Sequence, residues 1–342
     1  MLSIVLVGPG LVGNELLTQL TKNGKQHGIR VIAISNSKRM VLGTDLSDNF
    51  TLDSERDLYR IEEHAEKFKP CAFVDCTSNQ DIANLYVQWL KKGFSVVTPN
   101  KKAFSSDLSL YSKILELTDR TLNPTAPFVR HEATVGAGLP IISTLTNLVK
   151  TGDKILKIEG IFSGTLSFIF NTFSDSNLKF SEIVKDAKSK GFTEPDPRDD
   201  LNGVDVARKT TILARLSGLK NTTLESFPTE NIVPKELRNL NTVEFMERLP
   251  EFDEHFENLK LEAKKENKIL RYVGVVDVSN QKCSVELKSF DKSHPFGGLK
   301  GSDNIIAFYT ERFSPQPLII QGAGAGKEVT AFGIYCDILS IL

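Results

Sequence analysis

The start of the chain constrains its fold most strongly. The aliphatic run over residues 3–7 predicts a buried strand, and Gly8-Pro9-Gly10-Leu11-Val12-Gly13 separates this strand from a helical pattern over residues 11–22. A GxGxxG sequence between a strand and a helix is typical of a dinucleotide-binding loop. The alternative is an ordinary tight turn, which needs no ligand.

Each position of this loop has a physical reason for its residue type. Gly8 permits a tight turn, Gly10 lets the backbone approach a pyrophosphate, and Gly13 permits close packing of the helix. The amides at the start of the helix, including those of Leu11 and Val12, face the anion. We therefore expect these five residues to bind the cofactor.

The rest of the first half alternates between strand patterns and helix patterns. The predicted strands are residues 30–35, 72–76, 95–98 and 128–134, and the predicted helices are residues 81–92, 108–117 and 141–149. Such alternation indicates parallel β-α-β units. The predicted fold class is therefore α/β, with a Rossmann-like nucleotide-binding domain built on a parallel sheet.

The second half has a looser pattern, typical of an α+β domain. Its predicted strands are residues 155–162, 270–278, 283–290, 304–309 and 317–321, and its predicted helices are residues 166–173, 180–190, 201–217 and solvated helices within 231–267. These strands suit an antiparallel or mixed sheet. A glycine turn then opens a last helix over residues 329–342.

The length agrees with two domains, since domains average roughly 150 residues and the chain has 342. We predict a dinucleotide-binding domain over residues 1–138 together with 322–342. A substrate-binding domain with a mixed sheet is predicted over residues 139–321.

Charge and composition exclude several classes of protein. The 42 Lys and Arg residues balance 43 Asp and Glu residues, so no basic field exists to attract nucleic acid. No apolar run approaches the roughly 18 residues of a membrane span. The four cysteines are sparse and none has CxxC spacing, which indicates a reducing compartment and a cytoplasmic protein. The five histidines have no spacing typical of a zinc site.

The end of the second predicted strand bears on the choice between NADP and NAD. The sequence there is Ser35-Asn36-Ser37-Lys38-Arg39, without the carboxylate that usually binds the ribose of NAD. Lys38 and Arg39 would instead attract a 2′-phosphate, so NADP is favoured and NAD remains possible. The alternative is that both side chains lie on a solvated loop.

Two further candidates follow later strands of the parallel sheet. Thr77 and Lys101 each come directly after a strand, at the sheet edge where open α/β proteins bind ligands. We expect Thr77 to touch the cofactor, and Lys101 to contact the nicotinamide, a phosphate or a substrate carboxylate. The alternative for Lys101 is an ordinary surface lysine.

A charged segment over residues 192–209 contains the candidates for acid–base chemistry. Asp205 and Lys209 are four residues apart and share one face of a predicted helix. The functional interpretation is a lysine that donates a proton beside the hydride-transfer centre and is held by an aspartate. The alternative is an exposed ion pair worth only about 0.3–0.5 kcal/mol. Spacing alone does not separate these interpretations.

Taken together, these residues resemble homoserine dehydrogenases, especially the short fungal type, over nearly the whole chain. The resemblance rests on five strings in the family's order, at residues 98–104, 131–140, 160–166, 194–201 and 322–326. It implies NAD(P)-dependent interconversion of L-homoserine and L-aspartate 4-semialdehyde, in threonine and methionine biosynthesis. It also implies a homodimer formed through the second domain, with neither a kinase domain nor an appended regulatory domain.

The resemblance also implies roles for individual residues. Lys209 resembles the proton donor and acceptor, Glu194 and Asp205 resemble substrate ligands, and Gly326 resembles a cofactor contact. An unperturbed lysine has a pKa of about 10.4, so oxidation of homoserine should accelerate as the pH rises.

The same resemblance implies a bound monovalent metal ion, expected to be sodium. The family's ligand positions resemble Glu132 and the carbonyls of Val135, Ala137 and Leu139 here. This alternation is physically reasonable, since carbonyls two residues apart in an extended segment point to one side. The ion is expected to organise the domain junction rather than to perform chemistry. Pro9 and Cys76 depart from the family's usual residues, and both bear on the cofactor rather than on the reaction.

Two other functions remain as alternatives. An aspartate semialdehyde dehydrogenase would need a cysteine nucleophile, but Cys71 and Cys76 lie on or before an early predicted strand rather than beside a base. A catalytically silent nucleotide sensor would keep only the first domain's chemistry, and the retention of Glu194, Asp205 and Lys209 argues against it.

Overall fold

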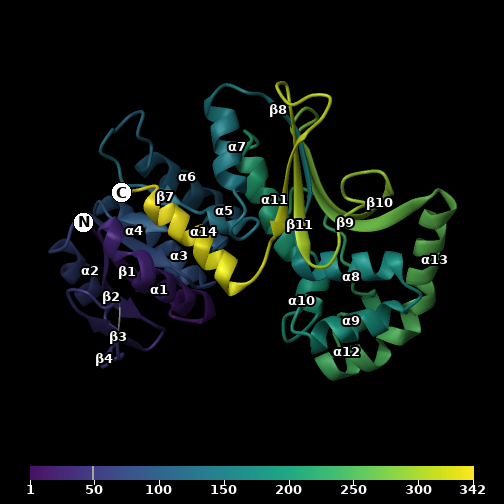
Figure 1. Ribbon diagram of the computed structural model, residues 1–342, viewed down its shortest axis with the longest axis horizontal. Helices are drawn as coiled ribbons and strands as arrows, with labels where there is room; N and C mark the ends of the chain where they lie inside the picture. Colours follow the sequence, from purple (N-terminus) through teal and green to yellow (C-terminus); the bar gives the residue numbers. More distant parts are fainter. Residues whose placement is uncertain (48–49) are drawn as a thin grey trace. The chain divides into compact units, whose positions relative to one another are not determined.

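The computed structural model describes residues 1–47 and 50–342 (Figure 1). The chain forms two compact units, one of residues 1–142 with 326–342 and the other of residues 143–325. The units thus divide after residue 142, where we predicted residue 138, and after residue 325, where we predicted residue 321.

The first unit is built on a seven-stranded sheet with the order β4-β3-β2-β1-β5-β6-β7. Its strands are β1 (Leu2–Val7), β2 (Ile29–Ser35), β3 (Arg39–Leu42), β4 (Ser54–Glu55), β5 (Cys71–Asp75), β6 (Ser95–Val97) and β7 (Val129–Arg130). Strands β2, β1, β5, β6 and β7 pair in parallel, and β3 and β4 extend one edge in antiparallel fashion. The chain continues from β1 to β2 on one side and returns to β5 on the other, so the order reverses beside β1. Ligands of open α/β sheets bind at this reversal.

Helices bury both faces of the central strands. The first unit contains α1 (Leu11–Asn23), α2 (Leu58–Glu66), α3 (Gln80–Asn84), α4 (Tyr86–Lys91), α5 (Lys102–Ser105), α6 (Leu108–Leu117), α14 (Lys327–Leu339) and the short 3-10 helices η1 (Lys25–His27) and η2 (Glu132–Thr134). Every residue of β1 is buried, as expected for a central parallel strand. The C-terminal helix α14 packs against α1, and Ile334 and Ile338 join the core around β1 and β2 (Figure 1).

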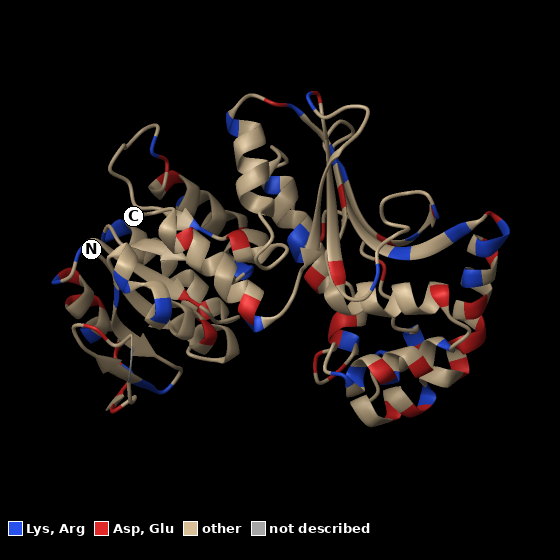
Figure 2. Cartoon of the chain, viewed as in Figure 1, with Lys and Arg blue, Asp and Glu red and all other residues tan. Residues whose placement is uncertain are grey.

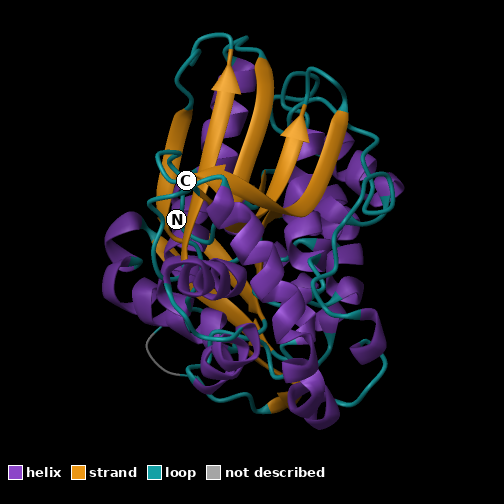
Figure 3. Cartoon of the chain, turned by 90° about the vertical axis from the view of Figure 1, so that its right-hand side faces the viewer, coloured by secondary structure: helices purple, strands orange, loops and turns teal. Residues whose placement is uncertain are grey.

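The second unit is built on a five-stranded sheet with the order β10-β9-β8-β11-β12. Its strands are β8 (Ile155–Ile161), β9 (Lys268–Asp277), β10 (Lys282–Asp291), β11 (Asp303–Thr310) and β12 (Leu318–Ala323). All its pairings are antiparallel, where an antiparallel or mixed sheet was predicted. The predicted fold class is confirmed, with this refinement. Figure 3 shows the long strands of this sheet running up the picture.

Helices cover one face of the second sheet. The α-helices are α8 (Gly164–Asp175), α9 (Phe180–Ser189), α10 (Arg198–Leu201), α11 (Val204–Leu216), α12 (Thr242–Arg248) and α13 (Asp253–Lys265), and the short 3-10 helices are η3 (Lys235–Leu237) and η4 (Leu249–Phe252). The boundary between the two units lies within a further helix, α7 (Ile141–Lys150). Helices α8, α11 and α13 pack on β9. Lysines and acidic residues are interspersed along α13, as expected for a solvated helix (Figure 2).

Some elements differ from the prediction for identifiable reasons. The helix predicted over residues 201–217 begins only at Val204, because Gly203 has a left-handed φ of +76° and ends the short helix α10. A side chain at Gly203 would place its Cβ 2.0 Å from the Tyr272 hydroxyl oxygen, so tertiary packing imposes this break. The helix predicted over residues 81–92 is split at Leu85 into α3 and α4.

Other differences come from short or polar elements. The strand predicted over residues 128–134 contains only β7 and then turns into η2. Helices α2 and α5 and strands β3 and β4 were not predicted, and the two strands, with 4 and 2 residues, are too short to show a clear alternation. None of the helices within residues 1–47 and 50–342 combines the length and the apolar character needed to cross a lipid bilayer.

Candidate active site

The glycine loop joins β1 to α1 with three glycines that meet different surroundings. Gly8 has a φ of +90°, and a Cβ there would lie 2.7 Å from Cγ2 of Thr77, so the loops after β1 and β5 touch. A Cβ on Gly13 would lie 2.3 Å from the Gly8 carbonyl oxygen. A Cβ on Gly10 would meet no atom of the described residues within 4 Å, so packing within the part of the chain that the structure describes does not explain this glycine. Among the residues that the structure describes, no side chain caps the first turn of α1. The open space therefore suits an anion that the helix N-terminus would bind.

The residues after β2 form a tight turn. The Asn36 side chain accepts the amides of Lys38 and Arg39 at 2.8 and 2.7 Å, which leads the chain directly into β3. The Arg39 guanidinium donates to the carbonyls of Leu52 and Asp53 at 2.9 and 2.8 Å. Lys38 is exposed. Of the two predicted 2′-phosphate ligands, Arg39 is thus engaged with its own unit's backbone.

A third basic residue at this edge was missed in the sequence. The Arg56 amide donates to the Lys38 carbonyl at 2.9 Å, which places residue 56 beside the turn after β2. The Arg56 Nε and Nη2 atoms are buried and have no hydrogen-bond partner among the described residues. Buried donors of this kind are costly unless an acceptor arrives. Nothing around Arg56 in the sequence signals this position.

Asp75, at the end of β5, ties together the two loops that carry Thr77 and Lys101. Its carboxylate accepts the Thr77 amide at 2.8 Å and the Asn100 side-chain amide at 3.0 Å, and also the Tyr86 hydroxyl. Burial raises the pKa of Asp75 above its usual range, while these donors oppose that rise. Lys101 is half-buried and precedes α5. Thr77 and Lys101 are predicted from the sequence, whereas Asp75, which orders their loops, is not.

The segment predicted to bind a monovalent ion is a compact turn in the first unit. Gly136 and Ala137 have φ values of +77° and +54°. The premise of an extended segment with alternating carbonyls is therefore wrong. Glu132 is buried, and its Oε1 atom accepts the Ile142 amide at 2.6 Å, while the Leu139 carbonyl accepts the Ile141 amide at 2.8 Å. The described residues contain no group of three or more His, Cys, Asp or Glu side chains suited to a metal, so a site here depends on backbone carbonyls.

Helix α14 holds this turn in place. It starts after Gly326, whose φ of +116° favours glycine. A Cβ on Gly138 would lie 2.4 Å from the Val329 carbonyl oxygen, so the turn and the helix touch through their backbones. The Asp337 carboxylate accepts the Glu132 amide at 2.8 Å, and burial raises the pKa of Asp337 to about 7.

Lys209 lies on α11 in the second unit and is buried. Its Nζ donates to the Phe162 carbonyl at 2.7 Å and forms an ion pair with Asp205 Oδ2 at 2.7 Å. The Lys209 side chain is only 10% exposed, whereas Asp205 is 45% exposed. An exposed surface pair is therefore excluded, because the ammonium is withdrawn from water and held by two acceptors.

Asp200 links the loop of Glu194 to this centre. One carboxylate oxygen of Asp200 accepts the Glu194 amide at 2.8 Å and the other accepts the Thr165 hydroxyl at 2.9 Å. Burial raises the pKa of Asp200, and the negative charges of Glu194 and Asp205 raise it further. The Glu194 side chain is exposed. The charges of Glu194 and Asp205 thus both reach Asp200, which was not predicted from the sequence as a site residue.

The cysteines do not support a thiol nucleophile. Burial raises the pKa of Cys71 to about 12 and also raises that of Cys76. A thiolate is the reactive form, so both groups are inert near neutral pH. This finding argues against an aspartate semialdehyde dehydrogenase.

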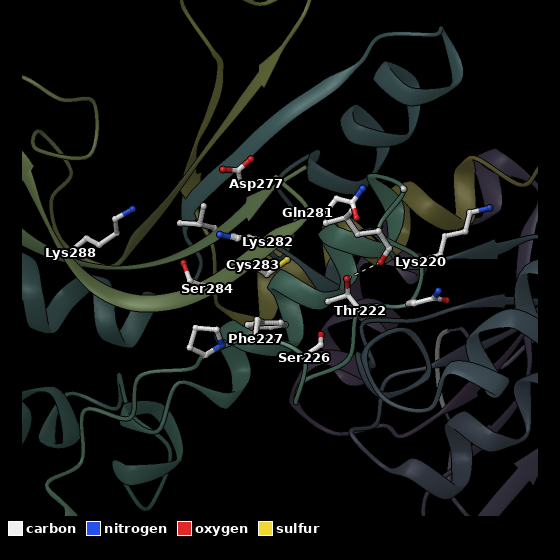
Figure 4. Close-up of a pocket in the computed structure, with 15 residues that line it drawn as sticks. Lys220, Thr222, Ser226, Phe227, Asp277, Gln281, Lys282, Cys283, Ser284 and Lys288 are labelled. Atoms are coloured by element: carbon white, nitrogen blue, oxygen red, sulfur yellow. Dashed lines mark hydrogen bonds between the residues drawn. The ribbon is translucent and has the colours of Figure 1, made fainter. Parts of the chain in front are cut away.

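A cavity of about 800 Å³ lies elsewhere in the second unit, between the loop after α11 and strands β9 and β10 (Figure 4). Its lining includes Thr222, Phe227, Lys282 and Cys283, and none of the predicted site residues. Burial raises the pKa of Cys283 to about 11, so this thiol is also protonated near neutral pH.

Comparison with known proteins assigns the family. A model of the homoserine dehydrogenase family matches residues 140–339, and a model of the homoserine dehydrogenase NAD-binding domain matches residues 8–122. The chain belongs to the homoserine dehydrogenase family. The predicted resemblance to this family is confirmed.

Individual relatives agree with this assignment. The chain is 44% identical to homoserine dehydrogenase of Saccharomyces cerevisiae, over 99% of this chain and 97% of the yeast protein. It is 46% identical to that of Paracoccidioides brasiliensis, over 98% of this chain and 96% of the relative. It is also 50% identical to an Arabidopsis thaliana bifunctional aspartokinase/homoserine dehydrogenase, of which it spans 38%.

Solved structures show the same fold. A Candida auris protein of unknown function is 44% identical and superposes with a TM-score of 0.92, covering 99% of this chain and 97% of that protein. A hyperthermophilic archaeal homoserine dehydrogenase in complex with NADPH has a TM-score of 0.74, covering 100% of this chain and 98% of that one. At 23% identity, the archaeal likeness bears on the fold alone.

Proposed function

We propose that this protein interconverts L-homoserine and L-aspartate 4-semialdehyde with NADP, as a step towards threonine and methionine. The observation that carries the proposal is Lys209, a buried lysine paired with Asp205 in a chain of this family. Buried lysines are rare unless a specific partner or a chemical role retains them.

Lys209 would act as the acid and base at the substrate's reacting oxygen. The reduced nicotinamide supplies the hydride when it is bound. Lys209 Nζ donates a proton to the alkoxide oxygen that develops during reduction, and takes this proton back during oxidation. The Phe162 carbonyl and the Asp205 carboxylate orient the ammonium before the reaction. Oxidation should therefore accelerate as the pH rises.

The carboxylates around Lys209 suit the ammonium group of an amino-acid substrate. Glu194 and Asp205 are the proposed substrate ligands, and Asp200 holds the backbone of Glu194. An excess of negative charge at this point favours a cationic α-amino group over an uncharged aldehyde or alcohol. This preference would distinguish homoserine from a simple alcohol.

The proposed cofactor site uses the first unit's sheet edge. Gly8, Gly10, Gly13 and the amides of Leu11 and Val12 would hold the pyrophosphate, because the loop has open space at Gly10. Thr77, Lys101 and Gly326 are further proposed contacts, on loops that Asp75 and α14 order.

We propose that Arg56 and Lys38, rather than Arg39, bind the 2′-phosphate of NADP. The unpaired buried nitrogens of Arg56 support this role, since a phosphate oxygen would satisfy them. The bonds of Arg39 to Leu52 and Asp53 make it less suitable.

A sodium ion would suit the oxygen atoms of Glu132 and of the Val135, Ala137 and Leu139 carbonyls. These donors are hard oxygen ligands, and the left-handed backbone at Ala137 is compatible with a turn that gathers carbonyls around a cation. The ion would brace the turn that packs on α14. Thermal denaturation in sodium chloride against tetramethylammonium chloride tests this role, and equal midpoints in the two salts would contradict it.

We also propose a cytoplasmic homodimer. The four cysteines are all unpaired, which suits a reducing compartment. Leu318, Ile319 and Ile320 in the edge strand β12 are only half-buried, which supports contact with a second copy through the second unit. Light scattering should give twice the mass of one chain, and the mass of a single chain would contradict the proposal.

The decisive experiment removes the lysine. Lys209→Ala should still bind NADPH, measured by fluorescence, and should lose turnover by about two orders of magnitude or more in the nicotinamide absorbance assay. Lys190→Ala is the matched control, because Lys190 also pairs with an acidic residue four positions earlier at 2.7 Å but is 53% exposed. Near-normal turnover of Lys209→Ala would exclude the proposed mechanism.

A further inference from the structure

The carbonyl that holds Lys209 has a second donor from a distant strand. Phe162 O accepts Lys209 Nζ at 2.7 Å and Asn304 Nδ2 at 3.0 Å. Asn304 lies on β11, is completely buried and is 142 positions away from Phe162 in the sequence. Two hydrogen bonds restrict the direction of this carbonyl more than one would.

The orientation of the Asn304 amide follows from this contact. If its oxygen and nitrogen were exchanged, two acceptors would face each other at the Phe162 carbonyl. In the observed orientation, Asn304 Oδ1 is buried and has no hydrogen-bond partner among the described residues. An unsatisfied buried amide oxygen lowers stability, and Asn171 in the same unit has one as well, so the contact with the Phe162 carbonyl is what distinguishes Asn304.

A glycine in the segment that ends the second unit makes room for this amide. A Cβ on Gly324 would lie 2.0 Å from Asn304 Cγ and 2.1 Å from Asn304 Nδ2. Asn304 has no space to retreat, because it is buried in the unit's interior. Gly324 does not have a left-handed φ, so packing against Asn304 explains the glycine at this position.

We propose that Asn304 is a positioning residue for Lys209, acting through the Phe162 carbonyl that both side chains share, and that Gly324 is required for this arrangement. Asn304 orients the acceptor, the acceptor directs Nζ, and Nζ meets the substrate oxygen. The proposal rests on the proposed role of Lys209 and extends it to two residues with no assigned function.

The test replaces Asn304 without creating a large cavity. Asn304→Leu keeps the branched shape and removes the donor, and Asn304→Asp keeps the shape and, when ionised at the alkaline pH of the oxidation assay, turns the donor into an acceptor. Both variants should lower kcat by about tenfold or more, because a small misplacement of a catalytic group is costly. NADPH affinity, measured by fluorescence, should stay unchanged.

The pH dependence separates positioning from a general loss of structure. Without the competing Asn304 donor, the Phe162 carbonyl bonds the ammonium form of Lys209 more strongly, and Asp205 remains its ion-pair partner. The alkaline rise of homoserine oxidation should therefore move to higher pH in Asn304→Leu. It should move further in Asn304→Asp, which adds a negative charge. Gly324→Ala should displace the Asn304 side-chain amide and thereby reproduce the loss of kcat. This variant also provides the test if Asn304→Leu does not fold.

The matched control is Asn171→Leu. Asn171 is also buried in the second unit, but its amide donates to Ser167 Oγ and the Gly301 carbonyl. Normal kcat and pH profile in Asn304→Asp or Gly324→Ala would overturn the proposal. The proposal would also be overturned if Asn171→Leu lost as much kcat as Asn304→Leu for the same loss of thermal stability. If Lys209→Ala itself retained turnover, the proposed function would fail instead, and the two failures are thus distinguishable.

Discussion

Replacing Gly10 with alanine separates a ligand-binding loop from an ordinary turn. A Cβ at this position meets no atom of residues 1–47 and 50–342 within 4 Å, and the backbone there is extended, with a negative φ of −84°. Glycine is preferred over alanine at a helix N-cap, which favours the unmodified protein. Alanine lowers the conformational entropy of the unfolded chain, which favours the variant. Each effect is worth about 1 kcal/mol or less. The free energy of unfolding should therefore change by less than about 1 kcal/mol.

The effect of Gly10→Ala on cofactor affinity should be much larger. A pyrophosphate oxygen bonded to an amide of this loop would lie about 2.9 Å from the nitrogen, close enough to collide with a new methyl group. Losing one hydrogen bond to a charged group costs about 1.5–3 kcal/mol, which corresponds to about a tenfold to hundredfold weaker Kd. Fluorescence titration with NADPH measures the affinity, and urea denaturation measures the stability.

Gly13→Ala provides the comparison for this prediction. Its Cβ would lie 2.3 Å from the Gly8 carbonyl oxygen, so the helix must move away from the loop. Alanine gains up to about 1 kcal/mol in helix propensity, but overpacking costs about 1–3 kcal/mol, so we expect a net loss of stability. The reasoning is refuted if Gly10→Ala binds NADPH like the unmodified protein, because Gly10 would then serve an ordinary turn.

Three further predictions address the cofactor, the thiols and acid stability. Arg56→Ala should raise the KM for NADPH by about tenfold or more and leave that for NADH unchanged, and equal effects on both cofactors would contradict a phosphate contact. Peptide mass spectrometry after alkylation in the native state should find Cys336 modified before Cys71, whose pKa burial raises to about 12, and early labelling of Cys71 would contradict this order. Hydrogen bonds from Arg198 hold the pKa of Asp196 well below its usual range. The contribution of these bonds to the free energy of unfolding is therefore present above about pH 4 and is lost as the pH falls. Asp196→Asn should therefore make urea midpoints less sensitive to acid, and an unchanged slope would argue against this contribution.

The sequence alone determined the features that depend on neighbouring residues. The strand, glycine loop and helix at the start of the chain follow from an aliphatic run and from the backbone freedom of glycine, both of which are local. The pairing of Asp205 with Lys209 follows from helical geometry, which brings residues four apart together in any environment. Motifs of this kind were sufficient to predict the family and the fold class.

Only the tertiary structure decided how these local features are used. Helical spacing brings Lys209 to Asp205, but the packing of α11 on β9 determines that Lys209 is buried. Asp75 joins two loops across parallel strands, and Arg56 reaches the turn after β2 through an edge pairing that has no pattern in the sequence.

The bond of Asn304 to Phe162 spans 142 positions, and no local rule relates such distant residues. Local geometry repeats wherever a strand or helix forms, so a pattern in the sequence can indicate it. Burial and long-range hydrogen bonds depend on how the whole unit packs, and they select which of many polar side chains take part in the chemistry.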